Sequence, residues 1–146
     1  MPDDKLHAEI VTPYKVFFDD MVDMVIISSK EGEIGIMPGH APMMAALTPG
    51  EIRLKINGET RVAVGTNGYA EVGQGLVIIV VNAAEWAQDI DLSRARQALK
   101  RAEERYNDPA TDPQERNHAR HGMERAKARI KTGMKFQDNS FAGTSL

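Results

Sequence analysis

The spacing of apolar residues changes near residue 89, and this change constrains the fold more than any other feature. Before it, Ile52–Ile56 alternates apolar and charged residues, the period of a half-buried strand, and Asn57-Gly58 follows as a strong hairpin signal. After it, apolar residues from Leu92 onward recur at spacings of 3 and 4, the period of an α-helix. We therefore predict a β-rich module over residues 1–88 and a helical module over residues 89–133.

The first module consists of short apolar segments separated by turn residues. It lacks a strand–helix–strand alternation, so the pattern predicts an antiparallel β-sandwich or flattened barrel of about eight to ten short strands. Leu76–Val81 is continuously apolar, and we expect this strand to be buried on both faces. The other expected strands contain Ile10–Val11, Val16–Phe18, Val22–Ile27, Ile34–Ile36, Arg61–Val64 and Tyr69–Val72.

The second module is predicted to be an antiparallel two-helix hairpin. The first helix begins after Asp89 or Asp91, and the second opens at Pro113 and ends at Gly133. Residues 134–146 are short, polar and unpatterned, and we expect a flexible tail. The two apolar stripes are rich in alanine, so the hairpin is predicted to dock weakly and to move between docking sites. A permanently packed helical lid is the alternative. The stripes consist of Leu92, Ala95, Leu99, Ala102 and Tyr106, and of Ala119, Met123, Ala126 and Ile130.

Composition and charge exclude several classes of protein. The net charge is −3, with 6 basic and 12 acidic residues in 1–88 and 12 basic and 9 acidic residues in 89–146. The basic excess of the second part is small and interleaved with acids, which argues against nucleic-acid binding. The longest apolar run is only six residues, whereas a membrane-spanning helix needs roughly 20, so we expect no membrane insertion. The chain has no cysteine, which excludes disulfides and thiolate metal sites.

Isolated motifs give weak indications of enzymatic or metal chemistry. His40 has no serine or carboxylate specified beside it, and a general base needs an orienting group. His118 and His121 are three residues apart on the second helix but lack a third ligand, so we predict no metal site. No Walker A sequence is present. An enzyme with His40 as base, and a free-standing small-molecule-binding β-sandwich with a helical cap, remain as alternative functions.

One segment carries a family signature. Gly32–Pro42 has the sequence GEIGIMPGHAP and is followed by LTPG at Leu47–Gly50. It resembles the G-E-(I/L)-G-I-x-P-G-H-A-P…L-x-P-G signature of the ε subunit of bacterial F-type ATP synthases. The similarity continues at Gly68–Val72 and at Ile90–Ala95, where IDLSRA is similar to the family's (I/L)-D-x-x-R-A. It covers about residues 5–131.

The resemblance implies a non-catalytic subunit of the rotor's central stalk. In this family an N-terminal β-sandwich binds the γ subunit and the c-subunit ring, and a C-terminal hairpin transiently reaches the α/β catalytic head and inhibits ATP hydrolysis. The subunit couples proton flow to ATP synthesis, and the complex lies at the cytoplasmic side of the inner membrane. By resemblance, Glu31, Glu33 and His40 are expected to contact the c ring.

A regulatory nucleotide site is also expected in the helical module. Arg125 and Arg129 are four residues apart, so both leave one face of the second helix, and two guanidinium groups suit a triphosphate. No cofactor is required for the expected role, and the alternative is that Asp91 only caps a helix while the arginines pair with Glu124 or solvent. The resemblance implies an ATP site formed by Glu85, Ile90, Asp91, Arg94, Ala95, Arg125 and Arg129.

Overall fold

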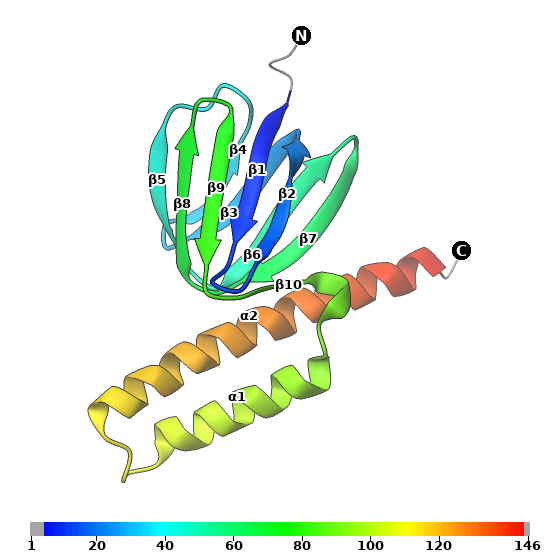
Figure 1. Cartoon of the computed structure of the whole chain (residues 1–146). Helices are drawn as coiled ribbons and strands as arrows, with labels where there is room; N and C mark the ends of the chain where they lie inside the picture. Colours follow the sequence, from blue (N-terminus) through cyan, green and yellow to red (C-terminus); the bar gives the residue numbers. More distant parts are fainter. Residues whose placement is uncertain (1–4, 145–146) are drawn as a thin grey trace. The chain divides into compact units, whose positions relative to one another are not determined.

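The computed structural model describes residues 5–144, which divide into two compact units, one up to Trp86 and the other from Ala87 onward. The first unit is a ten-stranded β-structure and the second contains helices (Figure 1). The strands are β1 (Leu6–Val11), β2 (Val16–Val22), β3 (Met24–Ser29), β4 (Gly32–Ile36), β5 (Met43–Leu47), β6 (Gly50–Ile56), β7 (Glu59–Gly65), β8 (Gly68–Gly73), β9 (Leu76–Val81) and β10 (Ala84–Trp86). The helices are the short 3₁₀ helix η2 (Ala87–Asp89), α1 (Leu92–Asn107) and α2 (Pro113–Thr144).

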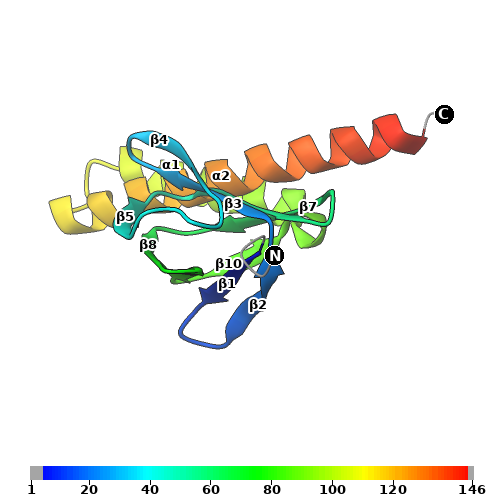
Figure 2. The ribbon, with the colours of Figure 1, turned by 90° about the horizontal axis from the view of Figure 1, so that it is seen from above.

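The strands form one sheet that folds over itself into two layers. Its order is β10-β7-β6-β3-β5-β8-β9-β1-β2, with β4 paired to the other edge of β3. The layers are joined where Ser29 of β3 pairs with Leu47 of β5, and Figure 2 shows β3 and β4 on one side and β1 and β2 on the other. The predicted sandwich is therefore confirmed. The strand pairs are antiparallel except for β1 with β9, which run parallel.

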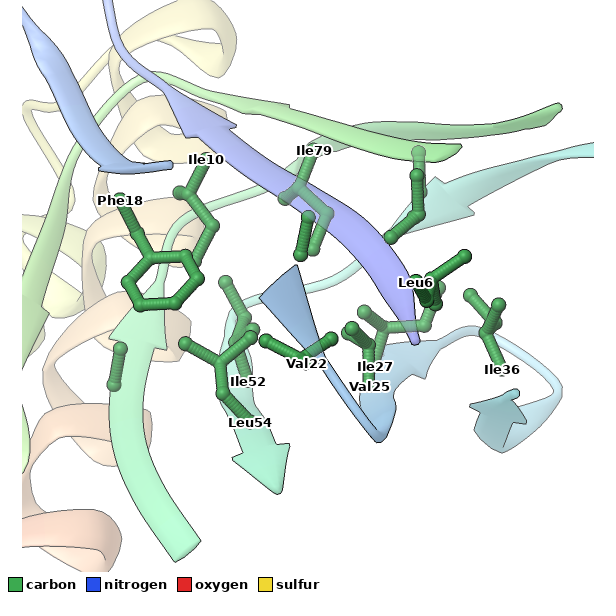
Figure 3. Close-up of a cluster of buried hydrophobic side chains, with 14 of the residues drawn as sticks. Leu6, Ile10, Phe18, Val22, Val25, Ile27, Ile36, Ile52, Leu54 and Ile79 are labelled. Carbon is green, nitrogen blue, oxygen red and sulfur yellow. The ribbon is translucent and has the colours of Figure 1, made fainter. Parts of the chain in front are cut away.

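Alternation along the strands fills the space between the layers. In β1, Leu6, Ala8 and Ile10 are buried, while His7 and Glu9 lie on the outer face. Side chains from both layers meet in one continuous apolar cluster (Figure 3). Each large aliphatic side chain buried there contributes about 1.5–3 kcal/mol to stability. The largest fully buried side chains are Leu6, Ile10, Ile27, Ile36, Leu54, Ile79, Val22, Val25 and Val77.

Three strand expectations need correction. β5, with the sequence MMAAL, and the three-residue β10 were not predicted, because neither shows an alternation of apolar and polar residues over the length of a strand, and the ladders with β8 and β7 supply the order. The expected strand Val22–Ile27 is divided at Asp23, whose backbone N–H donates a hydrogen bond to the backbone carbonyl oxygen of Lys55. β9 is not buried on both faces. Leu76, Ile78 and Val80 stay partly exposed because only one face of β9 meets the core.

The helical unit is an antiparallel hairpin, as predicted. Asp91 caps α1 by accepting a hydrogen bond from the Arg94 backbone N–H at 3.1 Å, and Asp112 accepts one from the Glu115 backbone N–H at 2.8 Å at the start of α2. In the connecting loop, Arg116 donates to the carbonyl oxygens of Tyr106, Asp108 and Thr111. Both helix starts and the loop are therefore fixed by local hydrogen bonds.

Small residues bring the two helices together. Ala95, Ala119 and Ala126 are buried, and a Cβ added at Gly122 would lie 3.7 Å from the Ala102 Cβ. A Cβ at Gly133 would lie 2.8 Å from Leu92 Cδ2. Because side chains of alanine size allow close helix approach but bury little area, this interface is thin.

The prediction that the second helix ends at Gly133 is wrong, because α2 continues to Thr144. Gly133 has no left-handed φ, and it is buried against Leu92 and Ile90. The glycine therefore serves close packing and does not terminate the helix. Residues 134–144 are helical where an irregular tail was expected, and 145–146 lie outside the described residues. Within the described part of the chain, no helix combines the length and apolarity that crossing a membrane requires.

Candidate functional site

Glu33, one of the expected c-ring contacts, is held by an arginine. It projects from β4, and its two carboxylate oxygens accept hydrogen bonds from Arg53 of β6 at 2.8 and 3.1 Å. Arg53 also donates to Glu51 at 3.1 Å. The hydrogen bond to Glu33, followed by that to Glu51, raises the pKa of Arg53. The bidentate pair fixes the direction of the Glu33 carboxylate across β3.

Glu31 and His40 lie at opposite ends of β4. Glu31 is exposed in the β3–β4 turn, where its backbone N–H donates to Ser29 Oγ. His40 follows β4 in a loop, and its Nδ1 lies 2.7 Å from the carbonyl oxygen of Ala41. Five strand residues between them span about 15 Å, so the structure does not bring the three expected c-ring residues into one cluster. The hydrogen bond of His40 to a carbonyl gives it no carboxylate orienter for a base role.

The expected nucleotide residues are divided between the two units. Glu85 lies on β10 in the sandwich unit, whereas the other six lie in the helical unit. Ile90 is 6% exposed and Ala95 is fully buried, so both pack inside the hairpin. Asp91 caps α1, as the alternative interpretation predicted, and Arg94 is exposed one turn further on.

The helix register places the two arginines of α2 at different levels of α1. Gly133 packs at Ile90 and Leu92, and Gly122 packs at Ala102. Because the helices are antiparallel, Arg129 is level with the first turn of α1, and Arg125 is level with a residue one turn later. At 1.5 Å per residue, Arg129 lies about 6 Å along the axis from the level of Asp91, and Arg125 about 12 Å. The structure therefore brings Arg129 nearer to Asp91 than Arg125.

Sequence reasoning missed a group of polar side chains on the outer face of β1 and β2. His7 and Asp19 are 2.5 Å apart, and Glu9 lies opposite Asp19 in the strand ladder. Hydrogen bonding to Asp19 raises the pKa of His7. Among the described residues, these three form the single group of side chains that could hold a metal ion, and His118 and His121 belong to no such group. The alternation of His7 with Glu9 was a usable signal, but the partner strand had to be known.

The same outer face carries an apolar row that crosses four strands. The register aligns Ala46 of β5, Tyr69 of β8, Val80 of β9 and Val11 of β1. Tyr69 is 44% exposed, and in the neighbouring row Met44 is 66% exposed. We call the four aligned residues the outer apolar row. Tyr69 and Ala46 are exposed while Val80 and Val11 are half-buried, and apolar side chains left accessible in this way are typical of a protein–protein interface.

Comparison with known proteins identifies both units. Residues 5–87 match the family model described as ATP synthase, Delta/Epsilon chain, beta-sandwich domain. Residues 88–133 match the model described as ATP synthase, Delta/Epsilon chain, long alpha-helix domain. The boundary between the two matches falls next to the division of the structure after Trp86.

Bacterial relatives agree over most of the chain. The ATP synthase epsilon chain of Nitratidesulfovibrio vulgaris is 41% identical over 128 residues, covering 86% of this chain and 93% of its own length. That of Syntrophobacter fumaroxidans is 40% identical over 132 residues, covering 90% of this chain and 98% of its own. That of Trichlorobacter lovleyi is 44% identical over 102 residues, covering 69% and 73%.

Solved structures share the fold. A chain in the Euglena gracilis mitochondrial ATP synthase OSCP/F1/c-ring structure matches with a TM-score of 0.76 and 23% identity, covering 86% of this chain and 79% of that chain. A chain in the Tetrahymena thermophila mitochondrial ATP synthase central stalk/c-ring structure matches with a TM-score of 0.63 and 16% identity, covering 88% and 96%.

A β-sandwich followed by a two-helix hairpin, with each module matched in chain order, defines a two-module subunit of a larger assembly. The chain belongs to the ATP synthase delta/epsilon chain family. Its role is that of the epsilon chain, a non-catalytic subunit of the ATP synthase complex. The family assignment takes precedence over the two alternatives from the sequence, a free-standing ligand-binding sandwich and an enzyme with His40 as base.

Proposed function

We propose that this chain is the rotor subunit that joins the γ subunit to the c-subunit ring, at the cytoplasmic side of the inner membrane. The outer apolar row carries the proposal, since an assembled stalk subunit needs a surface of this kind and a free-standing protein does not. The central stalk/c-ring assembly that contains the similar Tetrahymena chain supports a position in the central stalk.

In this proposal the γ subunit covers the outer apolar row. The row ends at Ala46 of β5, which is followed in the chain by Leu47. Leu47 pairs with Ser29 of β3, and Ser29 is two residues before Glu31. The γ contact and the Glu31 turn thus lie toward the same end of the sandwich. A subunit held by γ through this row presents Glu31 to a second partner at its end, which we assign to the polar loops of the c ring.

The γ contact is tested with two matched tyrosine variants. Tyr69→Glu introduces a charge into the row, whereas Tyr106→Glu makes the same change on α1, where the tyrosine is 37% exposed. Size-exclusion chromatography with purified γ is expected to give a complex for the wild type and for Tyr106→Glu, but not for Tyr69→Glu. Thermal melting verifies that both variants remain folded. A full complex with Tyr69→Glu contradicts the assignment.

The c-ring contact is assigned to Glu31, Glu33 and His40, with Glu31 nearest to the ring. Glu31 is exposed in a turn, while Arg53 holds Glu33 and a carbonyl holds His40. Since the chain has no cysteine, Glu31→Cys introduces a unique attachment point for a cross-linker. Glu59→Cys in the β6–β7 hairpin at the opposite end is the control. Cross-linking to a c subunit is expected for Glu31→Cys alone, and equal cross-linking of both contradicts the orientation.

We assign inhibition of ATP hydrolysis to the hairpin, through transient contact with the α/β head. Two observations support this assignment. The hairpin forms its own compact unit, and the contact between its helices α1 and α2 is built largely of alanine and glycine. Deletion of residues 89–146 is expected to raise the ATPase activity of the assembled enzyme while the subunit still assembles. A shorter deletion of 134–146 separates the contribution of the part of α2 beyond Gly133. Unchanged activity in both deletions contradicts the inhibitory role but leaves the stalk role.

We assign regulatory ATP binding to residues of the helical unit, Ile90, Asp91, Arg94, Ala95, Arg125 and Arg129. The level of Arg129 near the first turn of α1 supports this site, and exposed Arg94 adds a second guanidinium there. ATP at 100 times its dissociation constant is expected to stabilise the chain by about 2.7 kcal/mol. The shift in melting temperature is expected to be lost in Arg129→Ala and kept in Arg120→Ala, where the arginine pairs with Asn117. No shift at millimolar ATP contradicts the site.

A further inference from the structure

His7, Glu9 and Asp19 bring three metal-ligating groups together on a rigid surface. His7 and Glu9 are two residues apart on the outer side of β1, and Asp19 lies opposite Glu9 on the adjacent strand β2. One ligand atom from each of the three side chains lies within 4.8 Å of the other two. The β1–β2 ladder continues on both sides of this pair, so the backbone positions of the three residues are fixed relative to one another.

The charge around the group is uncompensated except by His7. Asp19 forms an ion pair with His7. Among the described residues, neither Asp19 nor Glu9 forms any other ion pair. Lys5, two residues before His7, directs its amino group to Asp23 and Asn57 instead. On the other side, β9 places Leu76 and Ile78 opposite His7 and Glu9. With a neutral imidazole, the group therefore carries two negative charges and offers one nitrogen and several oxygen ligands.

These ligands fit a borderline divalent metal ion. Zinc binds histidine nitrogen and carboxylate oxygen at about 2.0–2.2 Å, which places tetrahedral ligand atoms roughly 3.4 Å apart. His7 Nε2 and Asp19 Oδ1, now 2.5 Å apart, would separate by about 1 Å. Glu9 approaches by rotation of its side chain, since its carboxylate oxygen lies within 4.8 Å of the ligand atoms of His7 and Asp19. Water completes the fourth position on this exposed face.

We propose that His7, Glu9 and Asp19 bind one divalent transition-metal ion of the Zn²⁺ class on the outer face of β1 and β2. The imidazole nitrogen favours Zn²⁺, Ni²⁺ or Cu²⁺ over Mg²⁺, which prefers oxygen ligands alone. The site does not depend on the stalk partners, because all three ligands come from this chain. It lies beside the outer apolar row, since Glu9 is two residues from Val11 on the same face of β1.

The site is tested by calorimetric titration of the full chain with ZnCl₂ at neutral pH. The wild type is expected to bind one equivalent. His7→Gln and Asp19→Asn are each expected to weaken binding at least tenfold, and the matched variants His121→Gln and Asp20→Asn are expected to leave it unchanged. Because His7 and Asp19 are exposed, the variants are expected to melt as the wild type does without metal.

Proton NMR of the four histidines then identifies the ligand. Zinc is expected to shift the ring resonances of His7 while those of His40, His118 and His121 stay in place, and excess Mg²⁺ is expected not to reverse the shift. Three results overturn the proposal: no saturable binding below millimolar Zn²⁺, wild-type affinity in His7→Gln, or a zinc-dependent shift of the helical histidines in place of His7.

Discussion

Substitutions at two glycines of α2 are expected to change the stability of the hairpin in opposite directions, and together they test how its two helices pack. Gly122 faces Ala102 at an ordinary contact distance, because a Cβ there would lie 3.7 Å away. Gly133 faces Leu92 and Ile90, and its Cβ would lie 2.8 Å from Leu92 Cδ2 and 3.0 Å from Ile90 Cγ2. Space for a methyl group thus exists at the first position and not at the second.

The expected magnitudes follow from helix propensity and overpacking. Gly122→Ala gains about 0.8–1 kcal/mol of helix stability without a clash. Gly133→Val gains roughly 0.4 kcal/mol of propensity over glycine. It also forces the buried Ile90 and the neighbouring Leu92 to move, and overpacking of this kind costs about 1–3 kcal/mol. The net loss for Gly133→Val is therefore about 0.6–2.6 kcal/mol.

Hydrogen exchange of the full chain measures both effects, with the sandwich amides as internal reference. Gly122→Ala is expected to slow exchange of the α2 amides about fourfold to fivefold. Gly133→Val is expected to accelerate it about threefold to eightyfold. If Gly133→Val exchanges no faster than the wild type, the tight contact with Leu92 does not exist. The reasoning that Gly133 serves packing is then refuted.

Three further predictions concern single polar residues. Asp91→Ala removes the cap of α1 and is expected to destabilise the hairpin by about 1 kcal/mol, while Asp91→Asn retains most of the cap, as hydrogen exchange of α1 can measure. Arg53→Met is expected to destabilise the sandwich by about 1.5–3 kcal/mol in urea unfolding, and Glu33→Gln by less, because Glu33 is exposed. The hydrogen bond from Lys5, then that from the Asn57 backbone, lowers the pKa of Asp23. The contribution of ionised Asp23 to the free energy of unfolding is therefore present above the ordinary aspartate pKa and lost as the pH falls through the lowered value. The stabilities of the wild type and of Asp23→Asn should converge in acid, as urea unfolding at several pH values measures.

Much of the fold was predictable because local signals agreed with the final packing. The alternation of Ile52–Ile56 and the Asn57-Gly58 turn correspond to β6 and the β6–β7 hairpin, and Asp91 and Pro113 mark the two helix starts. β5 escaped prediction because its sequence, MMAAL, does not alternate apolar and polar residues. Its order comes from pairing with β8, which is distant in sequence.

The candidate sites were less predictable than the fold. The sequence indicated Arg125 and Arg129 as one face, but only the contacts of Gly122 and Gly133 set their levels against α1. Glu33 gave no sign of its partner, because Arg53 reaches it across β3 from a strand twenty residues away. His7 and Asp19 were separated by twelve residues, and the β1–β2 register joined them.

The sequence alone determined the two modules, the order of their elements and the family, because hydrophobic period, turn residues and the Gly32–Pro42 signature are local properties of the chain. The tertiary structure decided which side chains meet. It aligned Tyr69 with Val80 and Val11 in an exposed row, and it made Gly133 a packing contact inside a helix that continues. Register between strands and between helices depends on contacts between distant segments, and no local pattern encodes it.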